Sequence, residues 1–205
     1  VIKKIQIEIS LFILLLISVF FTNKFDIWVY GFFSQINYGP GVYYLKKFFV
    51  KITDLGDSLW YFLFFTFLFF ASYLMQASNT ISIKKYFYLK KFSVFGFFYL
   101  LLVGLITQTI KHLVGRPRPN HSQLDGSFEF NFFSTESSFH SFPSGHSSTI
   151  IAITIIMVLA IPKLKYFFYF FGFLIALSRV VVGAHFLTDV IGGAIIAISV
   201  YKMFD

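Results

Sequence analysis

Six apolar stretches constrain the fold of this 205-residue chain more than any other feature. The first three are 17, 17 and 19 residues long, close to the roughly 17–25 residues that a membrane-spanning helix requires. The last three, of 13, 13 and 14 residues, span a bilayer only if each extends into the polar residues beside it, where polar groups at membrane depth are usually functional. The stretches are Ile5–Phe21, Leu59–Met75, Phe92–Ile110, Thr149–Ile161, Tyr166–Ser178 and Val190–Met203.

The composition agrees with a membrane location. Hydrophobic residues make up 57% of the chain and charged residues 13%, whereas a soluble domain carries about 25% charged residues. This excludes a disordered chain, a coiled coil and an ordinary cytosolic enzyme. The absence of cysteine excludes disulfides, thiolate zinc sites and a cysteine nucleophile. We therefore predict one all-α domain over residues 1–205, built as a six-transmembrane-helix bundle.

The lysines predict how this bundle is oriented. Lys3 and Lys4 precede the first stretch without a cleavage site after it, which predicts an uncleaved anchor. If six helices alternate, nine lysines fall on one side, and the positive-inside rule makes that side cytoplasmic together with both termini. The loops over 111–143 and 179–189 then face outward from a cell (inner) membrane that the chain crosses several times. The nine are Lys3, Lys4, Lys84, Lys85, Lys90, Lys91, Lys163, Lys165 and Lys202.

A short helix is predicted between the first two spans. Tyr38-Gly39-Pro40-Gly41 indicates a turn, and the apolar residues that follow it recur at helical spacing while the lysines lie off that face. Such a helix lies in the outer membrane interface. It is either an ordinary amphipathic connector or a gate that helps to admit an anionic lipid. The apolar residues are Leu45, Phe48, Phe49 and Ile52.

Three polar clusters are predicted to lie on the outer side. The first, Lys111–Pro119, ends the third span; the second, Phe142–Thr149, opens the fourth, with Ser144 as the expected helix cap. The third, Ser178–Asp189, joins the last two spans, and on a helix His185 and Asp189 would share one face. Together they concentrate cations at a helix N-terminus, which is a favourable arrangement only around an anion such as phosphate.

These clusters resemble the signature of the membrane-bound type 2 phosphatidic acid phosphatases, also called lipid phosphate phosphatases, and the bacterial members in particular. The first part is Lys, six residues, Arg-Pro, present as Lys111…Arg118-Pro119. The second is Pro143-Ser144-Gly145-His146, and the third is Ser178-Arg179…His185…Asp189. The superfamily shares its phosphate pocket with vanadium haloperoxidases, but six apolar spans exclude a soluble haloperoxidase.

The resemblance implies a role for each motif residue. His185 would attack phosphorus and form a phosphohistidine, Asp189 would orient its ring, and His146 would act as general acid. The phosphoryl oxygens would be bound by the remaining motif residues, with no metal and no cofactor. These residues are Lys111, Arg118, Ser144, Gly145 and Arg179.

The expected activity is hydrolysis of a lipid phosphomonoester or diphosphate at the outer face. Candidate substrates are undecaprenyl diphosphate, phosphatidylglycerol phosphate, phosphatidate and lipid A. The alternatives are a phosphotransferase, which would release no stoichiometric free phosphate, and a non-catalytic lipid carrier, which would not need the His–Asp pair. The partners expected are the lipid substrate and membrane lipids, with no nucleic acid and no obligatory protein partner.

For some residues the sequence leaves the role undecided or assigns none. Arg116 either adds to the cation cluster or anchors the helix end at the membrane interface. His112, His121 and His140 have no assigned role, and the loop over 120–142, outside the signature, is expected to shape substrate choice. Its carboxylates show no metal-ligand spacing and are expected to be solvated; they are Asp125, Glu129 and Glu136.

Overall fold

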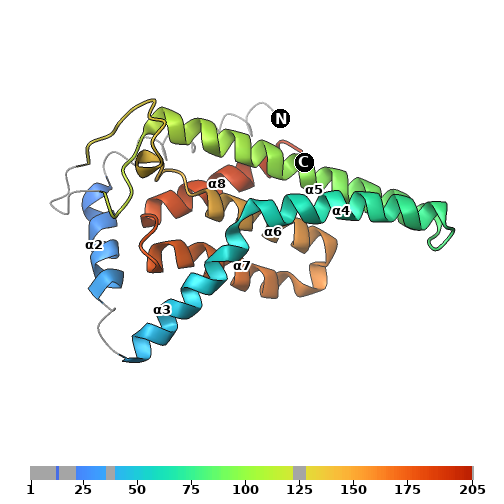
Figure 1. The fold of residues 1–205 in the computed structure, drawn as a ribbon, viewed down its shortest axis with the longest axis horizontal. Helices are drawn as coiled ribbons and strands as arrows, with labels where there is room; N and C mark the ends of the chain where they lie inside the picture. Colours follow the sequence, from blue (N-terminus) through green and yellow to red (C-terminus); the bar gives the residue numbers. More distant parts are fainter. Residues whose placement is uncertain (1–12, 14–21, 36–39, 122–127, 205) are drawn as a thin grey trace.

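The computed structural model describes residues 13, 22–35, 40–121 and 128–204, and within them the secondary structure is entirely helical. Seven α-helices and three short 3-10 turns are present in this part of the chain (Figure 1). In chain order they are α2 (Asn23–Gln35), α3 (Pro40–Ile52), η2 (Thr53–Gly56), α4 (Ser58–Ala77), α5 (Ile83–Val114), η3 (Ser137–Phe139), α6 (Gly145–Ala160), η4 (Pro162–Leu164), α7 (Lys165–Val181) and α8 (Leu187–Lys202).

Three helical segments are long and apolar enough to cross a membrane: α4, α5 and the segment Pro162–Val181 that contains α7. The apolar helix α6 is shorter, with 16 residues. Each of the five later stretches predicted from the sequence forms a helix, whereas Ile5–Phe21 lies outside the described residues apart from Ile13. The chain is a multi-pass helical membrane protein, and the count of six spans stays a prediction.

The three shorter apolar stretches do extend into their polar neighbours, as expected. Helix α6 begins at Gly145, α7 continues through Arg179 to Val181, and α8 begins at Leu187, before Asp189. The polar motif residues therefore lie at helix ends, where backbone amides and carbonyls have no partners within the helix.

The helices pack closely at small residues. Helices α4 and α5 run side by side in opposite directions, with the Phe65 ring against Gly96, where a Cβ atom would lie 2.3 Å from the ring. The Tyr99 hydroxyl donates to the Ala197 carbonyl oxygen at 2.6 Å and links α5 to α8 in the core. These contacts make a bundle in which α6 lies among α5, α7 and α8.

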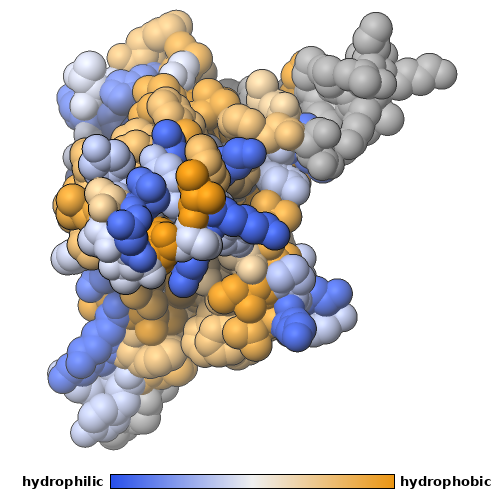
Figure 2. Space-filling view, turned by 90° about the vertical axis from the view of Figure 1, so that its right-hand side faces the viewer, coloured by the Kyte–Doolittle hydropathy of each residue, from blue (hydrophilic) through white to orange (hydrophobic). Residues whose placement is uncertain are grey.

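Outward-facing side chains on the spanning helices are apolar. On α4, for example, Phe67 is 72% exposed and Trp60 is 62% exposed, a degree of exposure that suits lipid. Figure 2 looks at the end of the molecule that carries the α4–α5 connection, where hydrophilic residues gather between hydrophobic flanks. This end lies far from the α7–α8 connection (Figure 1).

The predicted short helix between the first two stretches is confirmed as α3, although its interfacial position stays a prediction. Of its apolar face, Phe49 is buried, while Leu45 and Phe48 are about half exposed. The sequence analysis missed α2, a helix of 13 residues that precedes α3. Its Asp26, which belongs to no motif, is fully buried. The reason is an ion pair with a distant arginine, described below.

Candidate active site

The three motif segments meet at one end of the bundle. The first begins in the last turn of α5, which Gly115 ends in the left-handed conformation at φ 56°. A Cβ atom on Gly115 would also lie 1.6 Å from the Asn131 carbonyl oxygen, so only glycine fits this turn. The segments are joined by backbone contacts, in which the Ser144 amide donates to the Asp189 carbonyl oxygen at 2.9 Å and the Ser141 amide donates to the Arg116 carbonyl oxygen at 3.0 Å.

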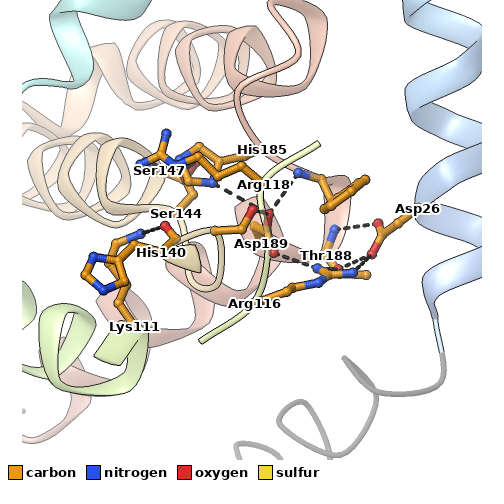
Figure 3. Close-up of polar contacts among 12 residues, drawn as sticks. Asp26, Lys111, Arg116, Arg118, His140, Ser144, Ser147, His185, Thr188 and Asp189 are labelled. Carbon is orange, nitrogen blue, oxygen red and sulfur yellow. Dashed lines mark hydrogen bonds and ion pairs between the residues drawn. The ribbon is translucent and has the colours of Figure 1, made fainter. Parts of the chain in front are cut away.

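His185 lies in the connection between α7 and α8, and Asp189 lies in the first turn of α8 (Figure 3). The sequence analysis considered both on one helix, but His185 precedes the helix start. The two side chains still face each other, with Nδ1 of His185 3.6 Å from Oδ2 of Asp189. Within the described residues Nδ1 has no hydrogen-bond partner, so a small ring movement would bring this nitrogen into hydrogen-bond range of the carboxylate.

Burial and charge determine the protonation of His185. The side chain is almost fully buried, and burial lowers the pKa of His185 to about 3, although the Asp189 carboxylate acts in the opposite direction. The nearby charges of Lys111 and Arg179 add to the lowering of this pKa. The imidazole is therefore neutral near pH 7 and has a free electron pair, as a nucleophile requires.

The Asp189 carboxylate is held by several donors. Oδ2 accepts the Ser141 hydroxyl at 2.6 Å and the Phe186 amide at 2.9 Å. Oδ1 accepts Nη1 of Arg116 at 2.6 Å. With both oxygens engaged and no exposed surface, this carboxylate has a fixed orientation toward His185.

The N-terminus of α6 forms a second wall of the site. Ser144 caps the helix as predicted, because its Oγ accepts the Ser147 amide at 3.3 Å. The next residue, Gly145, faces Lys111, whose Cε would lie 3.8 Å from a Cβ atom there. His146 packs against the turn η2, where a Cβ atom on Gly56 would lie 2.9 Å from the Cβ of His146. A helix N-terminus with an adjacent ammonium group is a favourable place for an anion.

Three cations surround this wall. Nζ of Lys111 donates to the His140 carbonyl oxygen at 2.7 Å, and Nε of Arg118 donates to the Ser137 carbonyl oxygen at 3.0 Å. Nη1 of Arg179 donates to the Thr53 hydroxyl at 2.8 Å.

Their charges lie close enough to repel one another. The positive charges of Arg118 and Arg179 both repel the Lys111 ammonium. Burial lowers the pKa of the half-buried Arg118 guanidinium, and the Asp189 carboxylate opposes the effect. The Nε atom of Arg179 is buried and has no partner within the described residues. This unpaired donor and the mutual repulsion both favour an anion between the three side chains.

Arg116 neither joins the cation cluster nor anchors a helix end at the membrane interface, the two roles considered from the sequence. Its guanidinium is fully buried, so it anchors no membrane interface, and it is paired with carboxylates rather than grouped with the other cations. Nη1 donates to Asp189 and Nη2 donates to Asp26 on α2, each at 2.6 Å (Figure 3).

Sequence reasoning also missed the residues of η2 and of α2 that reach the site. Thr53 and Asp26 belong to no motif, and both are buried. For Asp26 one signal was present, a lone carboxylate in the otherwise apolar run from Phe25 to Phe33. For Thr53 the sequence offers no signal.

The structure also shows the surroundings of the histidines and the loop that had no assigned role. The carbonyl oxygen of His140 holds Lys111, and the His140 ring lies 4.3 Å from the His112 ring between centroids. The His121 amide donates to the Arg118 carbonyl oxygen at 2.9 Å. In the 120–142 loop, residues 122–127, including Asp125, lie outside the described residues, whereas Phe128 stacks on Phe186.

Fold and site together define a multi-pass helical membrane protein with a histidine–aspartate pair beside a cluster of cations at one end of its bundle. A model of the PAP2 superfamily matches residues 92–204, more than half of the sequence, and the chain belongs to this superfamily.

Among curated relatives, lipid A 1-phosphatases of Rhizobium johnstonii and Rhizobium etli are 35% and 34% identical over 145 residues, or 69% of this chain. The chain spans only 59% and 62% of the length of these two relatives. The undecaprenyl-diphosphatase BcrC of Bacillus subtilis is 38% identical over 64 residues, which are 31% of this chain and 33% of BcrC.

Two crystal structures share the fold. A transmembrane PAP2-type phosphatidylglycerolphosphate phosphatase from Bacillus subtilis superposes with a TM-score of 0.67, covering 96% of this chain and 92% of its own at 23% identity. LpxE of Aquifex aeolicus superposes with a TM-score of 0.51, covering 85% of this chain and 93% of its own at 21% identity.

Proposed function

We propose that this protein is a lipid phosphatase that hydrolyses the phosphomonoester or diphosphate of a membrane lipid through a phosphohistidine intermediate on His185. The observation that carries the proposal is the buried, neutral His185 imidazole, which faces Asp189 and lies beside three cations and a helix N-terminus. Membership of the PAP2 superfamily supports the same chemistry.

In the first step, the imidazole nitrogen remote from Asp189 attacks phosphorus. A bond from nitrogen to phosphorus forms, and the bond from phosphorus to the leaving oxygen breaks. Asp189 stabilises the positive charge that develops on the ring. His146, at the first turn of α6, enters this step protonated, a form that the bound phosphate anion stabilises, and donates its proton to the leaving oxygen.

In the second step, water attacks the phosphohistidine and His146 takes its proton. The bond from phosphorus to nitrogen breaks, so inorganic phosphate leaves and His185 returns to its neutral form. The proton given to the leaving group is recovered from water, and both steps balance without a further reactant.

Phosphoryl transfer depends mainly on positioning and on charge stabilisation, and several groups provide both in this proposal. Lys111, Arg118 and Arg179 bind the phosphoryl oxygens. The backbone amides at the N-terminus of α6, with the Ser144 hydroxyl and Gly145, complete the cradle. The unpaired Nε of Arg179 supports this role.

A lipid substrate is supported by the location of the site at the end of apolar helices. The relatives named as acting on lipid A and on undecaprenyl diphosphate point to these two lipids first. Phosphatidylglycerol phosphate and phosphatidate complete the set of candidate substrates, since the site chemistry is common to all four.

The lysines support an extracytoplasmic site. Lys84 and Lys85 begin α5, whereas Lys111 lies at its other end. Lys163 lies between α6 and α7, at the opposite end of both helices from the motifs. By the positive-inside rule the site then faces the periplasmic side of the inner membrane, with both termini of the chain cytoplasmic.

The test is release of free phosphate by purified protein in detergent micelles from each of the four lipids. The expected result is stoichiometric phosphate from at least one lipid by the wild-type protein, and nearly none from the His185→Ala variant. The matched control is His121→Ala, a change at an exposed histidine. Transfer of the phosphoryl group to another lipid without phosphate release would instead indicate a phosphotransferase, and no turnover with bound lipid would indicate a carrier.

A further inference from the structure

Asp26, Arg116 and Asp189 form a chain of buried charges that reaches from α2 to the site (Figure 3). Arg116 lies between the two carboxylates, and none of the three residues has exposed surface. The side-chain carbon of the guanidinium group lies 4.7 Å from the centre of the Phe186 ring and 5.0 Å from that of Phe128. The two rings thus flank the guanidinium and keep water from it.

Thr188 closes the network. Its hydroxyl donates to Oδ2 of Asp26 and accepts Nη1 of Arg116 at 2.7 Å. Its backbone amide donates to Oδ1 of Asp26 at 3.1 Å. Asp26 therefore binds both the arginine and the first turn of α8, next to Asp189 along the chain.

Stability alone is a weak reason for such a network. Burying charged groups carries a desolvation cost comparable to the attraction between them, and well-packed apolar residues often stabilise a fold equally well. Arg116 is also not placed to bind the substrate phosphate, because both Nη atoms are occupied and the whole side chain, including an Nε that has no partner within the described residues, lacks exposed surface.

The charge balance points to a different role. Within this network two carboxylates and one guanidinium carry a net charge of −1, which opposes the cations Lys111 and Arg179 that also act on His185. Without Asp26, Arg116 would neutralise Asp189 by itself and weaken the interaction of this carboxylate with the ring. With Asp26 present, the guanidinium divides its hydrogen bonds between the two carboxylates, and Asp189 keeps negative charge for the positive ring formed on phosphorylation.

We infer that Arg116 and Asp26 are positioning residues for the phosphohistidine step. Both act through Asp189, so helix α2, which carries Asp26, contributes to the function of the site. The inference rests on the proposed function. It assigns no contact with substrate to either residue.

The first test compares Asp26→Asn with wild type in detergent micelles, on the lipid that gives phosphate release. The amide keeps the shape and removes the charge. We expect kcat to fall roughly 10–100-fold, the range known for the hydrogen-bond partners of metal-binding histidines, with KM within about twofold. The matched control is Glu129→Gln, at an exposed carboxylate, which should leave both constants unchanged.

A second readout needs no turnover. The chain has only five histidines, so ¹⁵N NMR of histidine-labelled protein can assign His185 by comparison with His185→Gln. We expect the wild-type ring to carry its proton on Nδ1, toward Asp189, and Asp26→Asn to raise the share of the Nε2 tautomer. A purely structural role for Asp26 would lower the melting temperature without changing this tautomer.

A third comparison tests the inference even if the Asp26→Asn variant fails to fold. Thr188→Val removes the hydroxyl that joins Asp26 and Arg116, whereas Thr188→Ser retains it. We expect the valine variant to lose kcat and the serine variant to restore it.

The outcomes separate the two proposals. If Asp26→Asn keeps wild-type kcat and wild-type tautomer, or if Thr188→Val behaves as Thr188→Ser does, the inference is wrong. If the wild-type protein releases phosphate from no lipid, the proposed function fails, while the NMR comparison still decides whether Asp26 orients His185.

Discussion

The Arg179 guanidinium donates a hydrogen bond to the Thr53 hydroxyl at 2.8 Å, across 126 positions of the chain. This bond joins the third motif to the turn η2, which no motif contains. The same turn packs against His146 through Gly56. One short turn between α3 and α4 therefore contacts both a phosphate-binding candidate and the candidate general acid.

Thr53→Val should weaken substrate binding more than chemistry. The change removes the acceptor for Nη1 and leaves the rest of the side chain nearly the same in volume. Because a hydrogen bond to a charged group contributes about 1.5–3 kcal/mol, we expect KM to rise about tenfold or more, with a smaller change in kcat. Steady-state kinetics test this, with Thr53→Ser and the exposed Thr109→Val as controls that keep wild-type constants. An unchanged KM in Thr53→Val would count against a binding role of Arg179.

His146 and His185 should differ in a burst experiment with an aryl phosphate. A p-nitrophenolate leaving group needs little protonation, so His146→Gln should still form the phosphohistidine and release one equivalent of p-nitrophenol, then stall. On an alkyl lipid phosphate the same variant should lose about 10²–10⁴-fold, the usual contribution of a general acid.

The control for this experiment is His185→Gln, which should show neither burst nor turnover because it lacks the nucleophile. Rapid-quench measurement of p-nitrophenol checks both variants. A burst in His185→Gln would exclude the assigned nucleophile, and equal losses on both substrates in His146→Gln would exclude the assigned acid.

Acid should destabilise the protein through His185. The pKa of this side chain is lowered to about 3 in the fold, from an ordinary value of about 6.5. Between these two values the unfolded chain binds a proton that the folded chain does not, so the free energy of unfolding falls as the pH falls, by up to about 1.4 kcal/mol per pH unit. Melting temperatures in detergent at pH 7.5, 5.5 and 4.5 should therefore fall more steeply for wild type than for His185→Gln. Parallel curves would show that His185 is not responsible.

Gly193 and Gly104 should respond oppositely to alanine. On α8, a Cβ at Gly193 would lie 2.4 Å from the Ser144 carbonyl oxygen, so alanine must push the helix from the α6 N-terminus. We expect Gly193→Ala to cost about 1–3 kcal/mol of stability and to lower kcat. Gly104, on α5, has nothing within 4 Å, and alanine there should raise stability by up to about 1 kcal/mol through helix propensity. Melting temperature and turnover of the two variants test this prediction. Wild-type stability and kcat in Gly193→Ala would contradict the close packing of α8 against the α6 N-terminus.

The helices could be predicted from sequence because their signals are local. Apolar runs located α4 to α8, and the serine before Gly145 located the start of α6. Their bounds moved mainly where polar residues joined a helix, as at Lys84 in α5. The helix α2 was missed, because 13 residues with one aspartate and one lysine resemble a polar connection as much as a helix.

In the candidate site, too, residues with local signals could be predicted and long-range partners could not. The motif residues could be chosen from the sequence because their spacing is fixed along the chain, and His185 and Asp189 lie only four positions apart. The ion pair of Asp26 with Arg116 spans 90 positions, and nothing in either segment specifies the other.

The sequence alone determined that this chain enters a membrane as helices and carries a phosphate-site signature, since hydropathy and motif spacing are properties of neighbouring residues. Only the tertiary structure decided which charges meet. Arg116 pairs with carboxylates while Arg118, two positions on, lies among cations. The reason is that packing of α2 and α8 buries the Arg116 guanidinium and leaves that of Arg118 partly exposed. Electrostatic partners depend on distance in space, and in this bundle that distance is set by helix packing.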